Sequence, residues 1–186
     1  VKEINLKVVG PEKVVIVGNN GVGKTTFMRG LFEGLRSRTD LRVGYMPQNY
    51  EDYLSEYGSV LDYVAENSFS KEEITEIRTF LACLKFTHEE VMGNISNLSG
   101  GQKAKLYLAK LMASKCSVLL LDEPTRNLSP LSGPVIREAL HDYPGTIISV
   151  SHDRKFIEDV ATKVYKMTID GLQEDNTLLK KNDEMI

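Results

Sequence analysis

The chain has 186 residues, with 23 basic and 26 acidic side chains and a formal net charge of −3. This length suits one α/β domain with a buried core. A composition of 41% hydrophobic and 26% charged residues excludes disordered and fibrous classes. The slight acidity argues against binding nucleic acid through bulk positive charge. Because no apolar run approaches the roughly 20 residues of a membrane helix, we expect a cytoplasmic protein without a membrane-spanning segment.

Cysteine content and the start of the chain give two further expectations. Cys83 and Cys116 are too few for a disulfide framework, and each stands in an apolar setting. We therefore expect two buried thiols in a reducing compartment. The sequence opens at Val1 with neither an initiator methionine nor a secretion signal, which suggests a processed or truncated chain.

Short β-branched or apolar runs alternate with helical patterns along most of the chain. Strands are predicted at residues 14–17, 43–46, 118–121, 146–150 and 164–168. Helices are predicted from Lys24 onward, at 133–141 and at 154–161. Strands that alternate with helices favour an α/β fold, with a mostly parallel sheet flanked by helices.

Between the second and third predicted strands the pattern becomes helical. Three helices are marked there, by Leu61, Val64 and Ala65, by apolar residues from Ile74 to Leu84, and by the run from Gly101 to Ser114. We therefore predict a single domain with an inserted helical subdomain. Its parts are a core of residues 1–51 and 115–176, a helical insertion over about 52–114, and a frayed tail over 177–186.

A glycine-rich run follows the first predicted strand and precedes a helix, and it matches G-x-x-x-x-G-K-[ST]. Its glycines permit positive φ angles and let backbone N–H groups approach phosphate oxygens. Lys24 is placed to neutralise β- and γ-phosphates, while the hydroxyl of Thr25 is a ligand for Mg²⁺. The strand–loop–helix context argues against a chance glycine turn. The predicted phosphate-binding residues are Gly18, Asn19, Asn20, Gly21, Val22, Gly23, Lys24, Thr25 and Thr26.

Two acidic residues end the apolar strand at 118–121. Asp122 is suited to hold hydrated Mg²⁺ opposite Thr25, and Glu123 to act as the general base toward water. Two acids at a strand end would equally fit a solvated turn. The carboxyl ends of parallel strands share one edge of a sheet, however, so these acids should lie beside the phosphate loop.

Ser99, Gly100, Gly101 and Gln102 open the third predicted helix of the insertion. A serine hydroxyl and free N–H groups at a helix N-terminus form a second candidate anion site. An ordinary N-cap is the alternative, and the position ahead of the acidic strand favours the anion site.

The ordered motifs resemble the nucleotide-binding domain of the ATP-binding cassette (ABC) family. Gly18–Thr26, Gln48, Leu98–Gln102, Leu119–Pro124 and His152 correspond to its Walker A, Q-loop, signature, Walker B and switch-histidine positions. The resemblance implies a P-loop NTPase fold and Mg²⁺-dependent ATP hydrolysis between two head-to-tail cassettes, where the signature of one faces the Walker A loop of the other. It also implies that Gln48 bridges Mg²⁺ and the attacking water, and that His152 contacts the γ-phosphate.

Two features favour the F branch of this family. The sequence of Ser151–Phe156 is SHDRKF, which resembles the S-H-D-R-x-F motif typical of the F branch. The spacing of 75 residues between Lys24 and Ser99 is short compared with that of transporter cassettes. This branch implies a second cassette, identical or fused, with this chain most like the C-terminal one. It further implies action on ribosomes, as a translation factor or an antibiotic-resistance protein.

Two alternatives remain open. An ATP-binding subunit of a membrane transporter would carry an exposed apolar groove between the Gln48 loop and the helical insertion. A nucleotide-dependent clamp without turnover is the other. Two departures from the family pattern also stand out: residues 1–17 hold no aromatic to stack on adenine, and Ser129 replaces the D-loop aspartate that helps to couple paired sites.

Overall fold

The computed structural model describes residues 4, 6–54, 58–64 and 70–179. Its strands form one six-stranded sheet in the order β2-β3-β4-β1-β5-β6. Neighbouring strands are parallel except for the antiparallel pair of β5 and β6, so the predicted mostly parallel sheet is confirmed. The strands are β1 (Lys13–Val17), β2 (Val43–Met46), β3 (Val118–Asp122), β4 (Thr146–Val150), β5 (Lys163–Thr168) and β6 (Gly171–Glu174).

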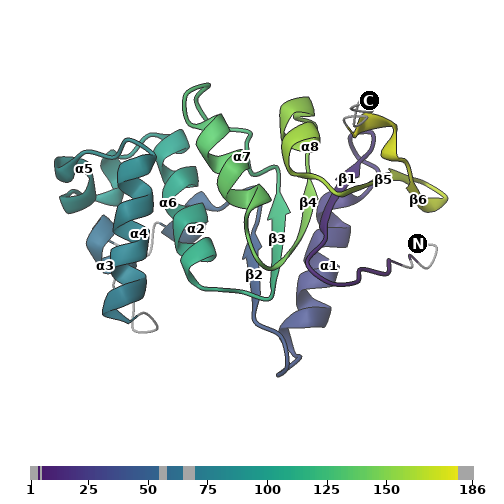
Figure 1. Ribbon diagram of the computed structural model, residues 1–186, viewed down its shortest axis with the longest axis horizontal. Coiled ribbons are helices and arrows are strands. Elements are labelled where there is room, and N and C mark those ends of the chain that lie inside the picture. The colour runs from purple at the N-terminus through teal and green to yellow at the C-terminus, as the bar shows by residue number, and fades with distance from the viewer. Residues whose placement is uncertain (1–3, 5, 55–57, 65–69, 180–186) are drawn as a thin grey trace, which may run out of the picture.

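Helices cover both faces of this sheet (Figure 1). Successive strand residues point to opposite faces. Val14 and Ile16 of β1 therefore pack in the cluster that contains Met28 of α1, whereas Val15 packs in the cluster that contains Phe156 of α8. These helices are α1 (Lys24–Arg36), α7 (Gly133–His141) and α8 (Arg154–Val160).

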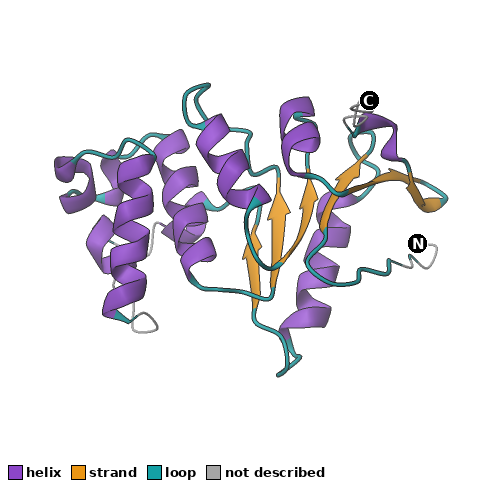
Figure 2. Ribbon diagram, in the orientation of Figure 1, coloured by secondary structure: helices purple, strands orange, loops and turns teal. Residues whose placement is uncertain are grey.

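The described residues between β2 and β3 are mainly helical and lie beside the β2 edge of the sheet (Figure 2). The helices are α2 (Glu51–Leu54), α3 (Val60–Val64), α4 (Lys71–Cys83), α5 (His88–Met92), the 3-10 helix η1 (Ile95–Asn97) and α6 (Gly100–Ala113). Fully buried Ile77, Leu81 and Leu106 of this part belong to the same apolar cluster as Leu119 of β3. Because the helices share a core with one face of the sheet, they pack against it rather than forming a separate body. Predicted helix position Ala65 lies outside the described residues.

The structure differs from the sequence expectations at the C-terminal end. Strand β6 was not predicted, and it pairs with β5 through a hairpin that joins Thr168 to Gly171. The 3-10 helix η2 (Asn176–Leu178) follows it, and Asn176 Oδ1 accepts a hydrogen bond from the N–H of Val164 at 2.9 Å. The chain thus remains packed up to Leu179, where a frayed tail was expected from residue 177. Residues 180–186 lie outside the description.

The two cysteines differ in their surroundings. Cys116 is buried, as expected, but Cys83 at the end of α4 is exposed, so the expectation of two buried thiols is wrong for Cys83. Tyr143 packs beside Cys116, and its phenol donates a hydrogen bond to the carbonyl oxygen of Cys116 at 2.7 Å. Desolvation in this buried position raises the pKa of Tyr143 to about 12.

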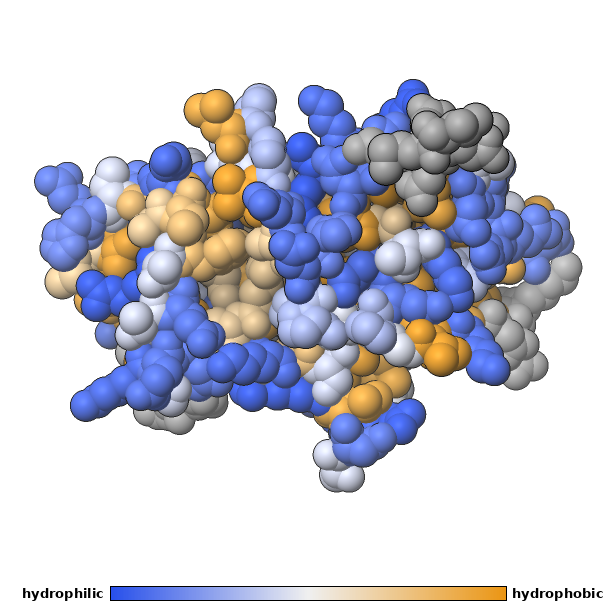
Figure 3. Space-filling model, viewed as in Figure 1, coloured by the Kyte–Doolittle hydropathy of each residue, from blue (hydrophilic) through white to orange (hydrophobic). Residues whose placement is uncertain are grey.

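The surface seen in Figure 3 is hydrophilic around most of its outline, and apolar side chains gather left of centre, where α4, α6 and α7 lie in Figure 1. The most exposed large hydrophobic residues are Leu131 and Ile169, in the β3–α7 and β5–β6 connections. Within the described part of the chain, no helix is both long and apolar enough to cross a membrane.

Candidate functional site

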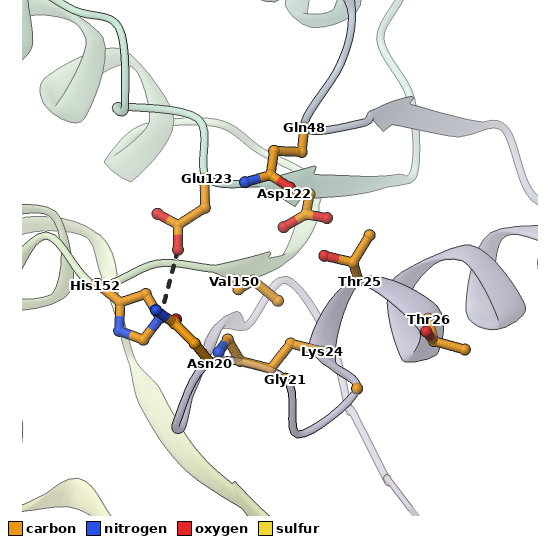
Figure 4. Close-up of a pocket in the computed structure, with 11 residues that line it drawn as sticks. Asn20, Gly21, Lys24, Thr25, Thr26, Gln48, Asp122, Glu123, Val150 and His152 are labelled. Atoms are coloured by element: carbon orange, nitrogen blue, oxygen red, sulfur yellow. Dashed lines mark ion pairs between the residues drawn. The ribbon is translucent and has the colours of Figure 1, made fainter.

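A polar pocket of about 310 Å³ opens at the carboxyl edge of the sheet, where the loops after β1, β2, β3 and β4 meet (Figure 4). Most sequence-predicted phosphate, metal and catalytic residues line it, although they come from four separate stretches of sequence. The lining residues are Asn20, Gly21, Gly23, Lys24, Thr25, Thr26, Gln48, Asp122, Glu123, Val150 and His152. Of the predicted phosphate-binding residues, Gly18, Asn19 and Val22 are not part of this lining, and Gly18 and Asn19 border a neighbouring hollow with Lys166.

The loop after β1 bends in the way that its glycines allow. Gly18, Gly21 and Gly23 have φ angles of 155°, 79° and 103°. A side chain at Gly18 would also collide with the carbonyl oxygen of Met167, which lies 2.5 Å from the position of a Cβ atom. Helix α1 then begins at Lys24 with no side-chain cap and no acidic residue in its first turn. Its positive N-terminal end is therefore available to an anion in the pocket.

Lys24 adds a cation to this helix end. Its side chain is 8% exposed, and its ammonium donates hydrogen bonds to the carbonyl oxygens of Gly18 at 2.7 Å and Asn19 at 3.0 Å. Two neutral carbonyls orient the ammonium without cancelling its charge. The loop therefore presents a fixed positive charge to the pocket.

Asp122, at the end of β3, faces Thr25, at the start of α1 (Figure 4). Burial raises the pKa of Asp122, while a hydrogen bond from Thr25 and the charge of Lys24 act in the opposite direction. Among the described residues, Oδ2 of Asp122 is buried without a hydrogen-bond partner. A desolvated carboxylate oxygen beside a hydroxyl is an oxygen-rich donor set suited to Mg²⁺.

Glu123 directly follows Asp122 and turns its carboxylate toward His152. Oε1 of Glu123 lies 3.7 Å from Nε2 of His152 (Figure 4). Burial raises the pKa of Glu123, and His152 partly offsets that rise. The backbone of Glu123 has a φ of 54°, held by a hydrogen bond from its N–H to the carbonyl oxygen of Val150 at 2.9 Å. A raised pKa and an oriented carboxylate are properties of a general base.

Gln48 lies on the loop after β2 and lines both the pocket and a second hollow of about 350 Å³. That hollow lies between the loop after β3 and the Gln48 loop with the first residues of α2. Its lining is polar and partly charged, because it consists of Gln48, Asn49, Tyr50, Glu51, Asp52, Arg126 and Asn127. This hollow is therefore polar, unlike the apolar groove that the transporter alternative expects between the Gln48 loop and the helical insertion.

The residues Ser99–Gln102 lie outside the pocket, at the start of α6. Ser99 is the N-cap of this helix, and its hydroxyl accepts a hydrogen bond from the N–H of Gln102 at 3.3 Å. The side chain of Gln102 accepts one from the N–H of Ser99 in return and donates one to Glu90. The N–H of Gln102 uses only an acceptor position of the Ser99 hydroxyl. The hydroxyl proton of Ser99 can therefore be donated to a group outside the helix. The structure thus places the second candidate anion site outside the pocket that the phosphate loop lines.

Sequence patterns missed three contributors to this region. Val150 lines the pocket at the end of β4, and the only signal for it is its place two residues before His152. Tyr50 and Asn127 form a hydrogen bond of 3.0 Å near the signature, and no spacing pattern points to either. Ser129, by contrast, is singled out from the sequence at the D-loop position, and its hydroxyl lies 3.0 Å from that of Ser132.

Residues 1–126 match the family described as ABC transporter. Among curated relatives, YdiF of Bacillus subtilis is 37% identical, over 92% of this chain and 28% of its own length. ABC transporter F family member 2 of Arabidopsis thaliana is 33% identical, over 97% of this chain and 28% of its own length. ATP-binding protein Uup of Haemophilus influenzae is 34% identical, over 88% of this chain and 27% of its own length.

The chain therefore spans less than a third of each of these relatives. Among solved structures, the ATP-binding cassette MJ0796, in a dimeric post-hydrolysis state bound to ADP and Pi, has a TM-score of 0.76. It is 20% identical, with 94% of this chain and 89% of that chain covered, and so shows the same fold. The family match covers the phosphate loop, the Gln48 loop, the signature and the acidic strand end. The chain belongs to the ABC transporter family as an ATP-binding cassette, and its curated relatives favour the F branch over a transporter subunit.

Proposed function

We propose that this chain binds Mg²⁺-ATP in the pocket at the carboxyl edge and hydrolyses it together with a second cassette. The convergence of Lys24, Asp122, Glu123 and His152 on one pocket carries this proposal. A fixed cation, a buried carboxylate, a candidate base and an imidazole are the groups that phosphoryl transfer to water requires.

Each residue has a role that follows from its position. Lys24 and the N–H groups at the start of α1 bind the phosphates, and Thr25, Gln48 and Asp122 would hold Mg²⁺ through oxygen atoms. The metal supplies charge neutralisation for the phosphates when it is bound. Glu123 accepts the proton of the attacking water.

His152 lies beside Glu123 and provides a second polar contact at the γ-phosphate end of the pocket. The position of its Nε2, 3.7 Å from the Glu123 carboxylate, supports this role, because one imidazole can then orient the base and the phosphate together. A clamp without turnover would not need a base with a raised pKa, so the environment of Glu123 favours hydrolysis.

A second cassette is needed because the signature residues lie outside the pocket that they would complete. Ser99–Gln102 would meet the phosphates bound by the mate, with the Ser99 hydroxyl as donor. The dimeric state of the solved neighbour supports this arrangement. The mate is a fused cassette or an identical chain.

The work driven by hydrolysis is a ribosome-linked step in translation or in antibiotic resistance. The relative named as an F family member and the SHDRKF motif after β4 support assignment to the F branch, for which such a step is proposed. The polar hollow beside Gln48 speaks against the docking of an apolar transporter helix.

Glu123→Gln tests the proposed role of Glu123 as the general base toward the attacking water. The variant keeps the side-chain shape but lacks the base, so ATP should still bind while turnover falls by at least about a hundredfold. Phosphate release and the Kd for a fluorescent ATP analogue measure the two effects, with Glu33→Gln on the exposed part of α1 as the control. Unchanged turnover in Glu123→Gln would remove this residue from its role, and failure of the wild type to bind Mg²⁺-ATP would refute the proposed function.

A further inference from the structure

Three segments of the candidate site meet at one buried phenol. Tyr50 follows Gln48 by two residues, and its side chain is 4% exposed. Its hydroxyl donates a hydrogen bond to the carbonyl oxygen of Gly100 at 3.1 Å and accepts one from Nδ2 of Asn127 at 3.0 Å. Gly100 belongs to the signature and Asn127 to the loop after Glu123, so one side chain joins all three segments.

The direction of these hydrogen bonds is fixed. Burial raises the pKa of Tyr50, so its hydroxyl keeps the proton that it donates to Gly100. The carbonyl group of Gly100 can only accept, so the phenol donates its single proton to it. The side-chain amide of Asn127 is then the donor to the phenol oxygen. A chain of two oriented hydrogen bonds therefore runs from the loop after β3 to the first residue of α6.

Packing reinforces the same connection. The carbonyl oxygen of Asn127 comes so close to Gly101 that a Cβ atom there would lie 2.6 Å from it. The ring of Tyr50 packs against the ring of Tyr107 in α6, with 5.8 Å between centroids. Close backbone contact and ring packing together prevent α6 from sliding independently of the two loops.

We propose that Tyr50 and Asn127 are positioning residues that hold the signature Ser99–Gln102 in a fixed relation to Gln48 and Glu123. The inference rests on the proposed function, since it requires Mg²⁺-ATP to be bound beside Gln48. Nucleotide that fixes the Gln48 loop then also fixes the start of α6 through the Tyr50 hydroxyl. One cassette thereby presents an ordered signature to its mate only when its own pocket is filled.

Hydrogen exchange of the 186-residue chain, with and without Mg²⁺ and a slowly hydrolysed ATP analogue, tests this connection. In the wild type, the analogue should slow amide exchange at Gly18–Thr26 and also at residues 99–104. Tyr50→Phe keeps the ring and removes only the hydroxyl. It should keep the analogue's Kd within about twofold, while the protection at residues 99–104 falls by roughly fivefold or more, because both hydrogen bonds are lost.

Asn127→Ala and the double variant extend the test. Asn127→Ala should weaken signature protection in the same direction, and the double variant should be no worse than Tyr50→Phe, because both remove one network. Tyr53→Phe is the matched control: Tyr53 lies in α2, its side chain is 52% exposed, and its ring also faces Tyr107 at 6.4 Å between centroids. It should behave as the wild type.

The outcomes separate the two proposals. Absence of protection at Gly18–Thr26 in the wild type would refute the proposed function. Protection there without protection at residues 99–104, or full signature protection in Tyr50→Phe, would refute the positioning role and leave the function standing. A Tyr50→Phe chain that loses analogue binding as well as thermal stability would show a general structural role and would also overturn the inference.

Discussion

The hydroxyl of Thr25 and the carboxyl group of Asp122 face each other across the gap between α1 and β3 (Figure 4). One oxygen of this carboxyl group, Oδ2, is buried without a partner among the described residues. Asp122→Asn removes a desolvated charge, so the metal-free chain should gain about 1 kcal/mol, or roughly 3 °C in melting temperature. Mg²⁺-ATP should no longer raise that temperature, whereas it should raise that of the wild type.

Thermal unfolding with and without Mg²⁺-ATP checks both halves of this prediction. Asp62→Asn, on the exposed side of α3, provides a control that should change stability by less than about 0.5 kcal/mol. A metal-free Asp122→Asn chain that melts at a lower temperature than the wild type would contradict the account of Asp122 as a desolvated carboxylate that lowers stability.

Lys24→Ala should weaken nucleotide binding without unfolding the chain. The ammonium of Lys24 contacts only the carbonyl oxygens of its own loop in the described structure, so its loss leaves the core intact. A hydrogen bond to a charged group contributes about 1.5–3 kcal/mol, which corresponds to a Kd for ATP roughly 10- to 100-fold higher. Equilibrium binding of a fluorescent analogue measures the change, and Lys71→Ala on the exposed side of α4 should bind as the wild type does.

Gly101→Ala should destabilise the chain, although alanine ordinarily favours a helix. The new methyl group would lie 2.6 Å from the carbonyl oxygen of Asn127, so either α6 or the loop after β3 must move. We expect a loss of about 1–3 kcal/mol. Gly34→Ala in α1 is the matched control, because nothing lies within 4 Å of its added Cβ atom, and it should gain about 1 kcal/mol. Chemical denaturation measures the free energy of unfolding of both variants. Equal changes for Gly101→Ala and Gly34→Ala would contradict the predicted clash between a methyl group at residue 101 and the carbonyl oxygen of Asn127.

Tyr143 should make stability depend on pH in the alkaline range. Its folded-state pKa is about 12, above the ordinary value of 10. Between these pH values the unfolded chain loses the phenol proton and the folded chain does not, so stability present below pH 10 is lost as pH rises toward 12. Two pKa units correspond to roughly 3 kcal/mol.

Tyr143→Phe isolates this contribution. The variant loses the hydrogen bond to Cys116 and should be about 1 kcal/mol less stable at pH 8. Its stability should then fall less steeply than that of the wild type between pH 10 and 11.5. Parallel slopes for the two proteins in urea denaturation would contradict the prediction, and Tyr53→Phe should retain the wild-type slope.

Much of the fold follows from short-range patterns. Strands at Val43–Met46 and Thr146–Val150 have the predicted bounds, because parallel strands with helices on both faces are short runs of mainly apolar residues. Strand β6 has two half-buried and two exposed residues and is defined by its pairing with β5, so its own sequence carries little signal. The exposure of Cys83 depends on how α4 packs, which helical spacing alone does not determine.

Local sequence predicts only part of the candidate site, and the rest depends on the family resemblance or on tertiary packing. The phosphate loop and Asp122 combine a strand with the residue types that phosphate and Mg²⁺ need, so local sequence predicts them. Gln48 and His152 follow only from the family resemblance. Tyr50 and Asn127 are 77 residues apart and meet through tertiary packing, which no local pattern encodes.

The left-handed backbone at Glu123 has a consequence for what evolution can place there. A φ of 54° costs a residue with a Cβ atom about 1–2 kcal/mol relative to glycine, and β-branched residues more. Glycine would thus relieve the conformation but lack a carboxylate. Glutamate occupies this position against its backbone preference, so selection for stability alone would favour another residue here. Substitution by glycine or asparagine at residue 123 would therefore mark a cassette that no longer needs the general base proposed here.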